Sequence, residues 1–185
     1  MARLPYPDPD ALPDRVQRAL DRVPPLNVFR MTAHAETAFR PWLAFGGALL
    51  SSLQLDPVVR ELVILRVARL SDAEYEWTQH EPIALAVGAN REQVTAVDRG
   101  ALDDRSLGEG ERAALRFATE VVRDVRASDE SLAALTAASF SPREVVELLL
   151  VIGQYMMVAR LAETAGIEID DPADVVTSSQ RRGAR

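Results

Sequence analysis

The chain of 185 residues contains neither cysteine nor lysine. Without a thiol it forms no disulfide, holds no zinc through cysteine, and performs no thiol nucleophilic or dithiol redox chemistry. All 21 basic side chains are therefore arginines, and 28 acidic side chains leave a net charge of −7. Because an acidic surface repels phosphate backbones, we expect no nucleic-acid partner.

Long apolar runs are also missing. The longest, around residues 62–65 and 148–152, are far shorter than the ~20 residues that a membrane-spanning helix needs. Residues 1–13 are rich in proline and aspartate and contain no apolar segment typical of a signal peptide. We therefore predict a cytoplasmic protein with no membrane partner.

Helix-forming residues dominate what is present, and no strand-like alternation is sustained. Asp56-Pro57 is a helix start signal and predicts a helix over 57–70. A capping-box pattern at Ser71 and Glu74 predicts the next helix, over 72–87. Further helices are expected over 11–23, 28–53 with a break near 33–36, a short stretch after Asn90, 106–125 and 142–165.

This pattern predicts an all-α fold. We expect one compact multi-helix domain over residues 26–169, an N-terminal extension over 1–25 and a polar C-terminal tail over 170–185. Two of the helices, 57–70 and 145–158, are apolar around most of their circumference, which is typical of helices buried on most sides. One domain of this size rarely covers two such helices, so we expect a homo-oligomer in which a second subunit covers part of them.

Three titratable residues fall on apolar helix faces. Glu61 shares its face with Ile64 and Leu65, while Glu76 and His80 lie four residues apart on the next helix and share a face there. Because the turn between the two helices is short, Glu61 and His80 lie at similar distances from it and are expected to meet. Carboxyl and imidazole groups in such surroundings are the ones that general acid–base catalysis uses.

Structural roles are the alternative for these three residues. A Glu-x-x-x-His pair is by itself more often a packing contact, and Glu61 could form a buried ion pair with Arg66, Arg69 or Arg160. The spacing offers no His-x-x-x-His or Glu-x-x-His pair, so we expect no metal site.

The run Arg60–Leu70, followed by Glu74-Tyr-Glu-Trp-Thr-Gln-His80 and Ile83–Gly88, resembles the carboxymuconolactone decarboxylase family. That family belongs to the alkyl hydroperoxidase D-like superfamily, and the resemblance extends over residues 26–167.

In the peroxidase branch of that superfamily, a glutamate is followed by Cys-x-x-Cys-x-x-x-His. Here the glutamate is Glu61 and the histidine is His80, but Ala73 and Glu76 occupy the two cysteine positions. Thiol peroxidase activity is therefore not expected. The decarboxylase branch also lacks the cysteine pair, and its carboxylate four residues before the histidine matches Glu76.

The resemblance implies a helical domain assembled as a trimer or hexamer, and a cofactor-free enzyme acting on a small carbonyl-bearing organic acid or lactone. In this hypothesis His80 is the proton donor, Glu76 orients it, and Glu61 is a second carboxyl with a raised pKa. Arg66 is the candidate anchor for a substrate carboxylate. The competing hypothesis is a non-catalytic ligand-binding or structural oligomer that has lost the superfamily's thiols.

Overall fold

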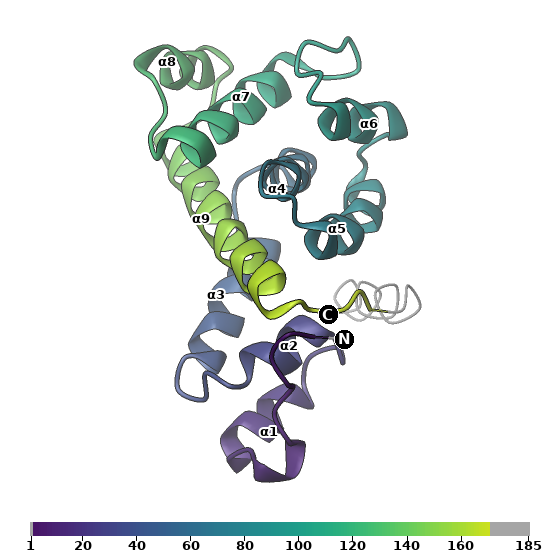
Figure 1. Cartoon of the computed structure of the whole chain (residues 1–185). Coiled ribbons are helices and arrows are strands. Elements are labelled where there is room, and N and C mark those ends of the chain that lie inside the picture. Colours follow the sequence, from purple (N-terminus) through teal and green to yellow (C-terminus); the bar gives the residue numbers. More distant parts are fainter. Residues whose placement is uncertain (1, 171–185) are drawn as a thin grey trace. The chain divides into compact units, whose positions relative to one another are not determined.

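The computed structural model describes residues 2–170, and these residues form nine α-helices, one 3₁₀ turn and no strand (Figure 1). The predicted all-α fold is confirmed. The helices are α1 (Asp14–Leu20), α2 (Asn27–Thr32), α3 (Phe39–Ser51), α4 (Pro57–Leu70), α5 (Glu74–Val87), α6 (Arg91–Arg99), α7 (Glu109–Asp124), α8 (Asp129–Ala137) and α9 (Pro142–Ala165), after the 3₁₀ turn Pro9–Ala11.

These helices group into two compact units. The first unit combines Met1–Ala48 with Leu161–Arg185, and the second unit is Leu49–Arg160. The divisions fall inside α3 and α9 rather than in linkers. The predicted boundaries at residues 25 and 169 stay predictions, and the predicted tail lies, except for Asp170, outside the described residues.

Helix α4 is the centre of the second unit, with α5, α6 and α7 packed around it (Figure 1). The Asp56 side chain caps its start by accepting hydrogen bonds from the backbone N–H groups of Val58 and Val59 at 2.8 and 3.1 Å. Every residue from Val59 to Ala68 is buried. The prediction that this helix is buried on most sides is confirmed, and its own chain supplies the cover.

Helix α9 is covered on one side only. Leu148, Val151, Ile152 and Tyr155 belong to the hydrophobic core of the second unit. On the other side, between 42% and 55% of each of four apolar residues is exposed: Val146, Leu149, Leu150 and Met157. The expected subunit contact stays a prediction, for which the exposed residues of α9 are the candidate surface.

Within the described residues, α9 is the one helix long and apolar enough to cross a membrane by length and composition. Half of the stretch concerned is buried inside the protein, as in a core helix. Counting contiguous apolar residues did not identify α9 as such a helix, because polar residues interrupt its apolar runs. An average of hydropathy over the helix tolerates such interruptions.

One local prediction is wrong, and one helix was not predicted. Ser71 and Glu74 form no capping box: Ser71 ends α4, and the Glu74 carboxylate binds Arg69 at 2.9 Å instead. Helix α8 was not expected, although the Ser128 side chain caps it by accepting from the backbone N–H of Ser131 at 3.1 Å. Its low amphipathicity left no helical period to detect.

Candidate functional site

A buried carboxyl–imidazole pair joins α4 and α5. The Nδ1 atom of His80 lies 2.8 Å from Oε2 of Glu61. Glu61 has no exposed surface, and His80 is 8% exposed. The two helices run antiparallel across a short turn at residues 71–73, so residues at similar distances from this turn meet. The predicted meeting of Glu61 and His80 is confirmed.

Glu61 has a second partner, which the sequence pattern did not indicate. Its Oε1 atom accepts a hydrogen bond from Nε of Arg60 at 2.9 Å, and Arg60 is itself buried. Neighbouring helix positions point about 100° apart, so helical spacing gave no reason to pair them. The length of the arginine side chain makes the contact possible.

The expectation of a raised pKa for Glu61 is wrong. Burial by itself raises the pKa of this carboxyl, but the hydrogen bond and charge of His80, together with those of Arg60, outweigh burial and lower it. Glu61 is therefore a carboxylate with both oxygens occupied.

This carboxylate determines which atom of His80 is available for chemistry. Because a carboxylate only accepts hydrogen bonds, Nδ1 of His80 is the donor in the contact. No residue among 2–170 contacts Nε2 through a hydrogen bond or ion pair, so Nε2 is the ring atom that can exchange a proton. The ring of Tyr155, from α9, packs edge-on against the imidazole with 4.7 Å between centroids and holds its plane.

Glu76 is buried without a partner. It is 1% exposed, and within the described chain neither of its carboxyl oxygens has a hydrogen-bond partner. Burial raises the pKa of Glu76 well above the ordinary value, because the apolar surroundings disfavour its charged form. The expected hydrogen bond from Glu76 to His80 is absent, and Glu61 orients the ring instead. The raised pKa expected for Glu61 is found at Glu76, and the orienting role expected for Glu76 is found at Glu61.

Arg66 lies on a different face of α4 from Glu61. Its Nε donates to Oγ1 of Thr119, on α7, at 3.0 Å, and its guanidinium lies against Gly100. Five residues of helix separate it from Glu61, which is about 140° around the axis. The structure therefore does not bring Arg66 together with the Glu61–His80 pair. Its role as a substrate anchor stays a prediction.

The other arginines considered as partners of Glu61 are also engaged elsewhere. Arg69 binds Asp98 and Glu74, and Arg160 donates to the backbone oxygen of Met156. The suggested ion pairs of Glu61 with Arg66, Arg69 or Arg160 are therefore wrong, and Arg60 takes that place.

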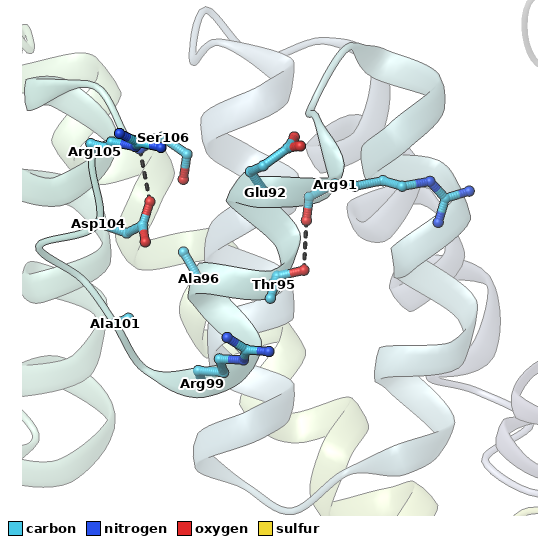
Figure 2. A pocket seen from close by; sticks show the side chains of 9 residues that line it. All are labelled: Arg91, Glu92, Thr95, Ala96, Arg99, Ala101, Asp104, Arg105 and Ser106. Atoms are coloured by element: carbon cyan, nitrogen blue, oxygen red, sulfur yellow. Dashed lines mark hydrogen bonds between the residues drawn. The ribbon is translucent and has the colours of Figure 1, made fainter.

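The second unit also contains an open pocket of about 610 Å³ between α6 and the loop that follows it (Figure 2). Figure 2 shows Asp104, Arg105 and Ser106 on the loop, opposite Arg99 and the other α6 residues, while the Arg91 side chain extends away from the loop. Glu61, Glu76 and His80 do not line this pocket. Among residues 2–170, no group of three or more acidic or histidine side chains is arranged to hold a metal ion.

Residues 36–120 match the sequence profile of the carboxymuconolactone decarboxylase family. No curated protein sequence matches the chain. The matched region includes α4 and α5 and therefore all three candidate residues.

Solved structures share the fold. An uncharacterized peroxidase-related protein from Ralstonia eutropha JMP134 with an alkylhydroperoxidase AhpD core has a TM-score of 0.81 at 22% identity, over 92% of this chain and 93% of that one. A peroxidase-related protein from Silicibacter sp. TM1040 has a TM-score of 0.77 at 19% identity, over 91% and 90%. A cysteine-to-alanine variant of the debrominase Bmp8, in complex with 2,3,4-tribromopyrrole, has a TM-score of 0.75 at 15% identity, over 98% and 99%.

Over residues 36–120 the chain is therefore similar to the carboxymuconolactone decarboxylase family, it has an alkyl hydroperoxidase D-like fold, and it contains no cysteine.

Proposed function

We propose that the protein is a cofactor-free proton-transfer enzyme, similar in reaction class to 4-carboxymuconolactone decarboxylase, that acts on a small carbonyl-bearing acid or lactone. One observation carries this proposal. A buried carboxylate orients His80 through Nδ1, and Glu76, a second buried carboxyl whose pKa is raised by burial, lies four residues earlier on the same helix face. Carboxyls whose environments drive their pKa values apart are typical of acid–base sites.

The roles follow from the ionisation states. In a decarboxylation, the bond to the departing carboxylate breaks and its electron pair passes into the conjugated carbonyl, forming an enolate and carbon dioxide. The imidazole of His80, held through Nδ1 by the Glu61 carboxylate, transfers a proton from Nε2 to the enolate carbon and regains one from water. The O–H of neutral Glu76 donates a hydrogen bond to the developing oxyanion.

The same groups serve isomerisation or hydration beside a carbonyl, because each of these reactions also moves a proton at that carbon. The bound 2,3,4-tribromopyrrole of the debrominase supports a small planar molecule as the occupant of this fold. The absence of cysteine supports a reaction that uses no thiol.

Proton transfer can be tested before the full reaction is known. The protein is incubated in D₂O with unsaturated lactones and keto acids, and ¹H NMR follows the loss of signal at the carbon beside the carbonyl. We expect exchange with the natural protein and a loss of ~10²-fold or more with His80→Gln. The matched control is His34→Gln, at the other histidine of the chain, which is exposed and belongs to the first unit. Exchange at the natural rate in folded His80→Gln refutes the assignment.

The burial of all three side chains favours a second candidate, a non-catalytic ligand-binding or structural oligomer. Only 8% of His80 is exposed, so a substrate can reach Nε2 only if the residues around His80 move apart. For this second candidate, His80→Gln lowers the free energy of unfolding but does not change the proton-exchange rate of added compounds. Measuring both quantities on the same variant therefore distinguishes the two candidates.

A further inference from the structure

The first unit contains a pocket of about 400 Å³ lined by positive charge. It lies between α1 with the residues just after it and the first turns of α3. Its polar lining consists of four arginines and includes no carboxylate, and its remaining lining is apolar: Arg15, Arg18, Arg22 and Arg40, with Ala19, Val23, Leu43 and Ala44.

Helical spacing gathers these arginines. Arg15, Arg18 and Arg22 follow one another at intervals of three and four residues, so they project from the same side of α1 and its end. Arg40 faces them from the first turn of α3. Like charges at such spacing repel one another and destabilise the helix that carries them. The arrangement therefore has a cost that an anion would remove.

The walls of the pocket are held by a small hydrophobic core. Val16 and Phe39, both fully buried, belong to one cluster with Leu12 and Ala33, and Leu43 packs against it. Val16 and Phe39 are neighbours of the pocket arginines in α1 and α3. The pocket is thus preformed, which lowers the entropic cost of binding a ligand there.

The charge of the pocket is only partly compensated. Arg15 pairs with Glu36 at 3.3 Å and Arg18 with Asp14 at 3.4 Å, and all four of these side chains are exposed. Exposed pairs of this kind contribute little, so a ligand can displace them. Arg22 and Arg40 form no side-chain hydrogen bond or ion pair with any residue between 2 and 170. In a chain of net charge −7, a concave surface of one sign concentrates positive potential.

We propose that this pocket binds a small organic polyanion, a compact molecule with two or more carboxylate or phosphate groups. Guanidinium groups hold the planar oxygens of both anion types with paired hydrogen bonds. The apolar residues would contact the carbon body of the ligand, and the volume fits the ~300–1,000 Å³ range of small-molecule sites. A nucleic acid is excluded as the ligand because the acidic chain repels it.

Isothermal titration calorimetry tests this proposal on the full chain, with inorganic pyrophosphate and citrate as separate probes at constant ionic strength. Saturable binding of pyrophosphate alone assigns the site to phosphate compounds, and binding of citrate alone assigns it to polycarboxylates. We expect Arg22→Gln/Arg40→Gln to weaken binding by ~10-fold or more, since each charged hydrogen bond is strong. Both side chains are exposed, so the fold is expected to persist, and circular dichroism checks this.

Two matched variants sharpen the test. Arg123→Gln/Arg126→Gln changes the net charge equally at exposed positions in the second unit and should leave affinity within ~2-fold. Asp14→Asn/Glu36→Gln frees Arg18 and Arg15 from their partners and should tighten binding. The proposal is overturned if neither probe shows saturable binding with a dissociation constant below ~10 mM, because weaker binding is no more than nonspecific ion pairing. It is equally overturned if the Arg123/Arg126 variant loses as much affinity as the Arg22/Arg40 variant.

Discussion

Replacement of Glu61 by glutamine tests the central interaction of the candidate site. The carboxylate accepts from Arg60 at 2.9 Å and from His80 at 2.8 Å, in a position with no solvent exposure. Glutamine has the same shape but only one acceptor oxygen, so its NH₂ group must face one of the two donors. One buried N–H then lacks an acceptor, and the buried Arg60 guanidinium loses its counter-charge.

The expected cost can be estimated from these two losses. An unsatisfied buried donor costs ~1–3 kcal/mol, and removal of one partner from a buried ion pair costs ~3–5 kcal/mol in total. No cavity forms, so the free energy of unfolding at pH 7 should fall by about 3–5 kcal/mol. Domains are stable by only ~5–15 kcal/mol, so the variant is expected to fold with little margin.

The pH dependence gives this prediction a second readout. Because the pKa of Glu61 is lowered in the folded protein, its ionisation adds stability that is present above its ordinary pKa of about 4.5 and is lost as pH falls through the folded value. The difference in the free energy of unfolding between the natural protein and Glu61→Gln should therefore be constant near neutral pH and become smaller in acid.

Urea unfolding followed by circular dichroism, at one fixed protein concentration, measures both quantities. Glu92→Gln, at an exposed position, is the control and should change stability by less than ~0.5 kcal/mol. A loss below ~1 kcal/mol at pH 7, or a difference that does not narrow in acid, would refute the role of Glu61 as a buried carboxylate.

Three further predictions follow from Glu76, α9 and the missing thiols. Because the pKa of Glu76 is raised in the folded protein, the free energy of unfolding falls as pH rises from about 4.5 through the folded pKa. Glu76→Met should therefore stabilise the protein by ~1–3 kcal/mol at pH 8 and by less at pH 4, and it should lower the proton-exchange rate. Unchanged or reduced stability of this variant at pH 8 contradicts the prediction. Light scattering should show a trimer or hexamer that Leu149→Arg/Leu150→Arg dissociates and the exposed control Glu130→Arg does not; a monomeric natural protein would contradict the interface on α9. Dithiol-dependent peroxide turnover should not exceed that of buffer, and turnover that survives repurification would mean that a reaction without thiols has been overlooked.

Local sequence signals determined the helices and the position of the central pair. Asp56-Pro57 predicted the start of α4, and the end predicted at residue 87 is the end of α5, where Gly88 follows with a left-handed φ of 116°. These signals act within one or two turns of the chain, so they need no tertiary context. Since the turn between α4 and α5 is short, the same signals also predicted that Glu61 and His80 meet.

Only the tertiary structure decided in which direction the pKa of each glutamate shifts. Glu61 and Glu76 both lie on apolar helix faces, and their sequence neighbours do not distinguish them. Packing places His80 and Arg60 on the oxygens of Glu61 and leaves those of Glu76 without a partner within the described chain, so one pKa is lowered and the other raised. A pKa depends on charges and donors within a few ångströms in space, and the arginine that supplies them was chosen by side-chain packing rather than by helical spacing.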